Sequence, residues 1–294
     1  MYNSNIRQFL NIYIKKGIEI MAGKSFERLY AETNNLYQSP YDSRDYKFKQ
    51  LIPVGAFPIP DEYETPRTPF LFDQGESSMC CAASFSTIRY MQEADESMGG
   101  SGITEPFSPT FTYANRLENE DFEGMYVRSC CKKGKEGALP YSILPGFYSL
   151  PEAIRRFNEK KETYLELAKP FAIDSYYQCS SREQVQMAIM QTKGVIGALN
   201  VYKCFYTPDE DGYVRYSRFK HRKSDGGHAV VICGWKKDRS GKLWWRVQNS
   251  WGKEYGDYGR CWIPEDMPWL DHPFAVVDTN FSTRWEEYKK EHSI

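Results

Sequence analysis

Three short apolar segments in the second half of the chain, residues 228–234, 243–249 and 259–263, constrain its fold most strongly. Polar and glycine-containing stretches separate them at the spacing of β-hairpins, and a fourth apolar run precedes them at residues 195–202. Runs of this length between turn residues are typical of strands. We therefore expect the second half of the chain to form mainly antiparallel β structure.

The first half of the chain shows a different periodicity. Between Cys80 and Glu96, apolar residues recur at helical spacing, which predicts a helix with Cys80 at its N-terminus. Further helices are expected over residues 109–117, 150–167 and 181–191, the first and last of which begin at serine N-caps. Helices followed by antiparallel strands predict the α+β class.

These patterns divide the chain of 294 residues into four parts. They are an N-terminal arm (1–68), a mainly helical domain that contains Cys80 (69–192), a mainly β domain (193–282) and a C-terminal tail (283–294). The arm is rich in Tyr and Asn and then in Pro, so we expect it to be extended and to act as a latch or short propeptide. Charged residues interrupt the apolar positions of residues 6–20, which favours an amphipathic segment over a secretion signal.

Bulk composition excludes several function classes. The formal net charge is -1, so no global field favours nucleic acid, and no apolar run is long enough for a membrane helix. The eight cysteines include two adjacent pairs that are poor disulfide partners within themselves, and we expect reduced thiols in a cytoplasmic protein. No cysteine or histidine spacing matches a metal site, so neither a metal nor a cofactor is expected.

Four side chains in the sequence form the set that a thiol acyl-transfer enzyme needs. They are Cys80 as nucleophile, His228 as base and then acid, Asn249 as the group that orients the histidine, and Gln74 as oxyanion donor. A helix N-terminus favours a thiolate, which supports the choice of Cys80. Cys81 is the rival nucleophile, and we expect it to point into the core of the helical domain instead.

In these segments the chain resembles the papain-like cysteine peptidases, and the similarity runs from about residue 69 to 263. Gln74 lies six residues before Cys80, His228 lies in a Gly-His-Ala-Val context, and Asn249 begins an Asn-Ser-Trp-Gly motif. The resemblance implies a helical left domain, a β-barrel-like right domain and an active-site cleft between them. Ser77 and Cys81 depart from the family's usual cysteine and tryptophan, which favours a bacterial or phage-like member in a reducing compartment.

The resemblance also implies how the site works. Cys80 and His228 would form a thiolate–imidazolium pair, and Trp251 would shield the hydrogen bond between His228 and Asn249. Gly226 and Gly227 would let the substrate backbone approach beside the histidine, and Gly124 would form the opposite wall of the cleft. Together with Trp251, these glycines are the predicted substrate-binding residues.

The expected function is hydrolysis of peptide bonds in a peptide or protein substrate through an acyl-thioester, as an endopeptidase. Two alternatives use the same scaffold. The first is an aminopeptidase or transpeptidase, which the tail would favour if residues 284–294 blocked one end of the cleft. The second is a catalytically inactive binding protein. A separate regulatory expectation is that residues 1–60 of the N-terminal arm lie over the cleft and inhibit the site within the molecule.

Overall fold

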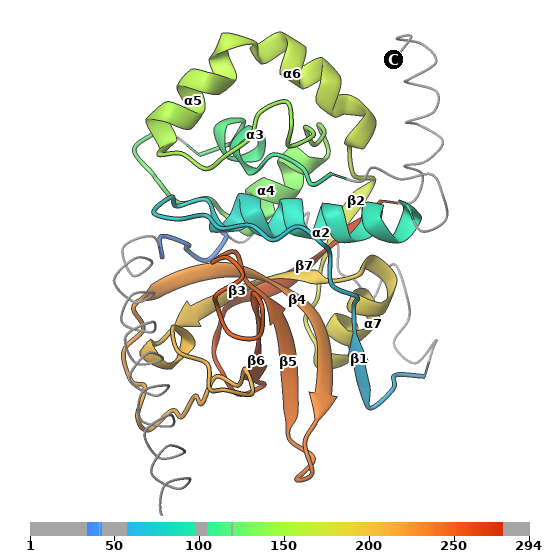
Figure 1. The fold of residues 1–294 in the computed structure, drawn as a ribbon, viewed down its shortest axis with the longest axis vertical. Helices are drawn as coiled ribbons and strands as arrows, with labels where there is room; N and C mark the ends of the chain where they lie inside the picture. Colours follow the sequence, from blue (N-terminus) through green and yellow to red (C-terminus); the bar gives the residue numbers. More distant parts are fainter. Residues whose placement is uncertain (1–33, 41, 43–57, 98–104, 119, 279–294) are drawn as a thin grey trace, which may run out of the picture.

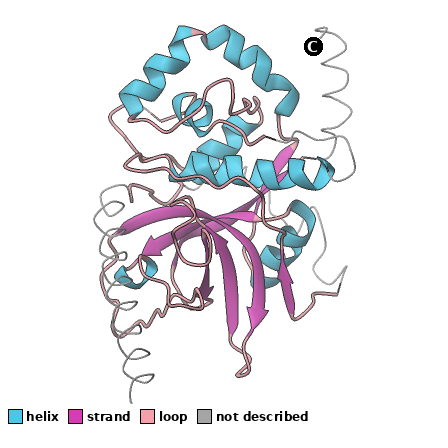
Figure 2. Cartoon of the chain, viewed as in Figure 1, coloured by secondary structure: helices cyan, strands magenta, loops and turns pink. Residues whose placement is uncertain are grey.

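A computed structural model of the chain describes residues 34–40, 42, 58–97, 105–118 and 120–278. Most helices gather on one side of the molecule and a single curved sheet lies on the other, with helix α2 (Cys80–Ser97) between them (Figures 1 and 2). This arrangement confirms the α+β class and the division into a helical half and a β half. No helix in the described residues is long and apolar enough to span a membrane.

The sheet is antiparallel throughout, and its strands follow the order β2-β7-β3-β4-β5-β6, with β1 paired to β4. The strands are β1 (Glu62–Glu64), β2 (Ser175–Gln178), β3 (Val195–Val201), β4 (Gly226–Lys237), β5 (Leu243–Gln248), β6 (Arg260–Pro264) and β7 (Trp269–Val277). The four strands predicted from apolar runs correspond to β3, β4, β5 and β6. Every residue of β5 and β6 is buried, as the short apolar runs indicate.

Helix α2 lies at the centre of the molecule. Its apolar side chains share one buried cluster with residues of β3, β4 and β7, so the helix joins the two halves. The other helices are α3 (Pro109–Ala114), α4 (Val127–Gly134), α5 (Leu150–Glu159), α6 (Lys161–Ala168) and α7 (Arg182–Thr192), with short 3-10 turns η3 (Lys169–Phe171) and η4 (Lys203–Phe205). Ser108 and Ser181 accept backbone N–H bonds as N-caps of α3 and α7.

The predicted boundary between the helical and the β domain, at residue 192, differs from the structure. Helix α7 was assigned to the helical domain that ends at residue 192, but its side chains are buried in the core of the sheet with β3, β4 and β5. Strand β2 likewise pairs with β7 over residues 175–178. The β half therefore begins near residue 175, because a helix belongs to the domain whose core buries its apolar side chains.

The predicted arm also contains a permanent part of the fold. Residues 62–64 were expected to be extended surface chain, but they form β1, which pairs with β4 from Glu62–Lys236 to Glu64–Gly234. Tyr63 stacks on Trp235 with ring centroids 5.3 Å apart. The amphipathic segment over residues 6–20 and the tail from residue 283 lie outside the described residues.

Candidate active site

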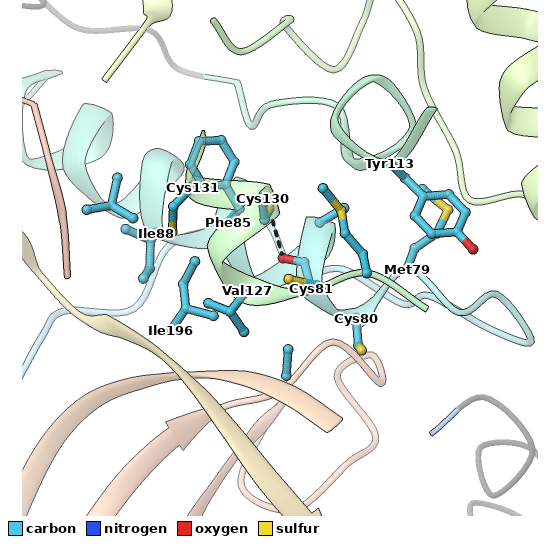
Figure 3. Packing of buried hydrophobic residues seen from close by; sticks show 14 of the residues in the cluster. Met79, Cys80, Cys81, Phe85, Ile88, Tyr113, Val127, Cys130, Cys131 and Ile196 are labelled. Carbon is cyan, nitrogen blue, oxygen red and sulfur yellow. Dashed lines mark hydrogen bonds between the residues drawn. The ribbon is translucent and has the colours of Figure 1, made fainter. Parts of the chain in front are cut away.

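Cys80 is the first residue of helix α2 and lies where this helix packs against the sheet. Its side chain leaves the first turn in a different direction from that of Cys81 (Figure 3). Cys81 is fully buried, and its carbonyl oxygen lies 3.7 Å from the sulfur of Cys130 on α4. Position and direction therefore favour Cys80 as the nucleophile and leave Cys81 in the core.

His228 and Asn249 are joined by a short hydrogen bond. His228 lies near the start of β4, Asn249 directly follows β5, and the imidazole Nε2 is 2.8 Å from the amide Oδ1 of Asn249. The Asn249 oxygen can only accept, so Nε2 is the protonated nitrogen. His228 is 0% exposed, and its Nδ1 has no hydrogen-bond partner among the described residues. One ring nitrogen is thus fixed, and the other is left for a reacting group.

Trp251 covers this histidine. The two rings stack with centroids 4.8 Å apart, and Phe205 packs edge-on against both rings. Trp251 is 1% exposed, so in this structure it shields the hydrogen bond from water. Its assignment as a substrate-binding residue stays a prediction.

Gln74 is linked to the same loop as Asn249. Its Oε1 accepts a hydrogen bond from Ser250 Oγ at 2.6 Å, and its Nε2 donates to the carbonyl of Ser77 at 2.8 Å. Ser77, where the family usually has a bridging cysteine, closes the turn with a 2.7 Å bond from its hydroxyl to the Gln74 carbonyl. The amide is therefore held in one orientation close to the start of α2.

The electrostatics of the site depend on its burial. Cys80 is 3% exposed, and this burial raises the pKa of its thiol to about 12, although the backbone N–H groups of Ala229, Cys80 and Cys81 oppose the rise. Burial lowers the pKa of His228 to about 4, against the hydrogen bond to Asn249. Burial therefore favours the neutral form of each group in this structure. It disfavours the expected thiolate–imidazolium pair, because burial removes the charged forms from bulk water.

The three glycines predicted to contact the substrate all contact residues 34–36 instead. Asn35 forms a parallel bridge with Gly227, in which the Leu36 N–H donates to the Gly227 carbonyl and the Gly227 N–H donates to the Asn34 carbonyl. A methyl group added to Gly124 would lie 2.0 Å from the Asn35 carbonyl oxygen. Added to Gly226, it would lie 2.4 Å from that of Asn34. Both walls of the predicted cleft therefore touch this one segment.

Side chains hold this segment in place. The Asn34 amide donates to the Tyr206 hydroxyl at 2.8 Å, and the Asn35 amide donates to Ser78 Oγ at 3.0 Å, two residues before Cys80. Leu36 is buried in the same cluster as Cys80. Farther along, the Ser39 N–H donates to Asp271, and Asp42 pairs with Lys132 at 3.2 Å. We name residues 34–40 together with Asp42 the cleft segment.

Comparison with known proteins finds a match over the second part of the chain. The family model for papain family cysteine proteases matches residues 126–267, a range that contains His228 and Asn249 but neither Cys80 nor Gln74. Two similar proteins of Caenorhabditis elegans are cathepsin B-like cysteine proteinase 3, 29% identical over 136 residues, and cathepsin B-like cysteine proteinase 4, 30% identical over 139 residues. Over part of its length the chain is therefore similar to papain family cysteine proteases. The two relatives match 43% and 42% of this chain, but only 35% and 40% of their own length.

Solved cysteine peptidases share the fold of this chain over most of its length. Xylellain, a cysteine protease from Xylella fastidiosa, superposes with a TM-score of 0.69 at 18% identity, covering 84% of this chain and 97% of xylellain. Procathepsin B S9 from Trypanosoma congolense superposes with a TM-score of 0.66 at 15% identity, covering 85% and 89%. The bacterial or phage-like origin expected from the sequence stays a prediction.

Sequence reasoning placed the arm over the site but did not identify which of its residues lie there. Asn34, Asn35 and Leu36 have no periodic pattern, and their burial depends on pairing with Gly227 far along the chain. It also missed Gln248 and Arg260, which lie behind Asn249. The signal for Arg260 was a charged residue in the short apolar run that became β6.

Proposed function

We propose that this chain is a cysteine-type peptidase with Cys80 as nucleophile and His228 as its base. The observation that supports this most is the protonation pattern of the buried imidazole. Nε2 is committed to Asn249 at 2.8 Å, and the unpartnered Nδ1 is left to exchange a proton. The backbone of Ala229, the residue after His228, lowers the pKa of the Cys80 thiol, and both residues lie where α2 packs against β4. The proposal pairs Cys80 with His228 across this junction.

The proposed reaction has two steps that balance protons and bonds. The Cys80 thiol transfers its proton to Nδ1 of His228, and the sulfur attacks the substrate carbonyl carbon. The imidazolium then protonates the leaving amine as the C–N bond breaks, which leaves an acyl-thioester on Cys80. Water, deprotonated by the same imidazole, hydrolyses the thioester. The Cys80 backbone N–H and the second N–H of the Gln74 amide would donate to the oxyanion.

The cleft segment makes the described state a latent one. It touches the three glycines predicted to receive the substrate backbone, and it leaves Cys80 and His228 almost without exposure. Intramolecular inhibition by the N-terminal arm is therefore part of the proposal. Solved relatives include the proforms of procathepsin L 3 from Tenebrio molitor and of procathepsin B S9, which supports the same idea.

Endopeptidase action on peptide or protein substrates is the form that we favour. Residues 34–36 lie against the three predicted substrate glycines and continue as chain to residue 40, so we liken them to an internal stretch of a substrate rather than a free end. An aminopeptidase or a transpeptidase would use the same acyl-thioester, and product analysis of a peptide library separates these alternatives. The cytoplasmic location also stays a proposal.

The test uses an opened chain, in which Leu36→Asp places a charge at a buried position of the cleft segment. Loss of leucine burial alone is worth roughly 1.5–3 kcal/mol, so we expect peptide hydrolysis to rise at least about tenfold over the unmodified chain. Gln38→Asp is the matched control, because Gln38 is exposed in the same segment. It should leave the chain as latent as before.

Replacement of the nucleophile completes this test. Cys80→Ala in the opened chain should abolish hydrolysis, whereas Cys81→Ala should retain it and should still react with a thiol-directed inhibitor at Cys80. Equal cleavage by the Cys80→Ala chain would refute the proposed mechanism. A folded opened chain with a reactive Cys80 but no cleavage of any library peptide would favour the inactive binding protein.

A further inference from the structure

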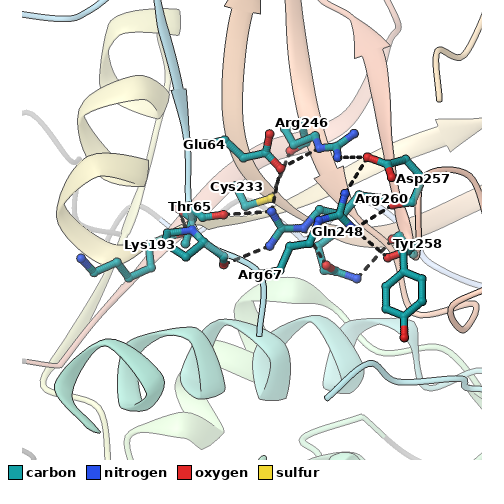
Figure 4. A network of polar contacts seen from close by, with 12 residues as sticks. Glu64, Thr65, Arg67, Lys193, Cys233, Arg246, Gln248, Asp257, Tyr258 and Arg260 are labelled. Atoms are coloured by element: carbon teal, nitrogen blue, oxygen red, sulfur yellow. Dashed lines mark hydrogen bonds and ion pairs between the residues drawn. The ribbon is translucent and has the colours of Figure 1, made fainter. Parts of the chain in front are cut away.

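Arg260 is a fully buried cation behind the candidate site. It begins β6, is 0% exposed, and pairs with Glu64 of β1 at 2.8 Å. Its other donors reach the carbonyls of Thr65 at 2.9 Å and Pro66 at 3.2 Å, while its Nε donates to Gln248 Oε1 at 2.9 Å (Figure 4). A buried guanidinium needs such partners to offset its loss of water. Its contact with Gln248 is the one that points toward the site.

Gln248 connects this cation to the catalytic asparagine. It is the last residue of β5, and its Nε2 donates to the carbonyls of Asn249 and Gly259, both at 3.1 Å. The Gly259 carbonyl also accepts the Asn249 N–H at 2.9 Å. The orientation of this amide is fully determined, because the guanidinium can only donate and both carbonyls can only accept.

We propose that Arg260 is a positioning residue for the candidate reaction, acting through Gln248 on Asn249. The guanidinium fixes the amide of Gln248, which fixes the backbone where Asn249 leaves the sheet. The Asn249 side chain then holds His228 Nε2 at 2.8 Å. This inference rests on the proposed function for its activity readout, but the geometry of the relay is independent of it.

Gln248→Glu in the opened chain tests the relay. The carboxylate keeps a partner for Arg260 but replaces the NH2 group with an oxygen, which faces two carbonyl oxygens and displaces Asn249. We expect kcat to fall roughly 10- to 100-fold, as for other small misplacements near reacting groups, with little change in KM. The hydrogen bond that His228 donates to Asn249 raises the pKa of His228. Its loss should therefore move the acid limb of the kcat/KM profile, which reports protonation of the base, to lower pH.

Two further variants separate positioning from plain structural support. Asp257→Asn is the control, because Asp257 pairs with Arg67 and Arg246 at the outer side of the same network and is half exposed. It should leave kcat and the pH profile unchanged. Arg260→Lys keeps a charge for Glu64 but lacks the Nε–H that reaches Gln248, so it should change both quantities in the same direction as Gln248→Glu.

The rate of Cys80 alkylation as a function of pH provides a readout that needs no peptidase activity. The alkylation profile should shift in the Gln248→Glu chain whether or not the opened parent cleaves peptides. A shifted profile together with a parent that cleaves no peptide would refute the proposed function and leave the relay supported. A folded Gln248→Glu chain with the parent's alkylation profile, and with the parent's kcat where there is turnover, would overturn the relay. A lower melting temperature without either change would assign the network to stability.

Discussion

Burial favours the protonated form of the Cys80 thiol, and we propose that the cleft segment provides part of this burial. Because the pKa of Cys80 is raised to about 12, its alkylation by iodoacetamide should rise with pH about tenfold per unit across the neutral range. In the Leu36→Asp chain the thiol meets water and an accessible imidazole, so we expect a much flatter profile and faster alkylation at pH 7. Mass spectrometry of the Cys80 peptide measures both rates, with the partly exposed Cys204 as internal reference. Coinciding profiles would contradict this effect of burial.

His228 gives a second prediction for a single residue, with a defined sign. Its pKa falls from 6.5 to about 4 in the folded chain, so the unfolded state binds more protons between these values. The contribution of the neutral, buried ring to stability is therefore present above pH 6.5 and is lost as the pH falls toward 4. Melting temperatures at pH 7 and 4.5 should differ more for the unmodified chain than for His228→Gln, which cannot titrate. Equal differences would show that other groups cause the acid lability.

Pairing of β1 with β4 depends on the absence of a side chain at Gly234. A methyl group there would lie 2.4 Å from the Tyr63 carbonyl oxygen and 2.9 Å from Glu64 Cα. We therefore expect Gly234→Ala to lower the free energy of unfolding by roughly 1–3 kcal/mol and to separate β1 from the sheet. Urea unfolding gives the first quantity, and proteolysis near Tyr63 gives the second.

The β4–β5 turn supplies the control for this prediction. Gly241 has a φ of +82° with nothing near an added Cβ. Asparagine tolerates that conformation, so Gly241→Asn should cost much less than Gly234→Ala. Similar losses in the two variants would mean that the steric contact between β1 and β4 is unimportant.

At the same scale, the sequence predicts only those strands whose pattern does not depend on distant partners. Strands β3 to β6 follow from short apolar runs, but β7 contains Pro273, and the register of its pairing with β3 shifts between Ile196 and Leu199. A regular alternation is absent there, so no local pattern predicts the strand. Strand β1 is three residues long in a proline-rich segment, and its pairing with β4 is a tertiary contact.

The candidate site shows the same division. Candidate roles for the residues at positions 74, 80, 228 and 249 can be assigned from the sequence, because their spacing and motifs resemble those of one family. The protonation states of Cys80 and His228 cannot be predicted from the sequence. They depend on burial in the cluster that contains Leu36 and on the stacking of Trp251, which only the folded chain provides.

For the whole molecule, the N-terminal arm has two parts with opposite roles. Residues 34–36 contact the predicted substrate glycines, whereas β1 belongs to the sheet, and Glu64 and Thr65 accept hydrogen bonds from Arg260. A chain that begins at residue 58 should therefore fold and hydrolyse peptides, because it loses the cleft segment and keeps the ion pair. A chain that begins at residue 67 leaves Arg260 buried without its carboxylate, which costs about 3–5 kcal/mol, and should melt well below the longer chain. Melting temperature and Cys80 alkylation at pH 7 compare the two truncations with the full chain. Latency in the chain from residue 58, or equal melting of the two truncations, would show that the arm is not divided in this way.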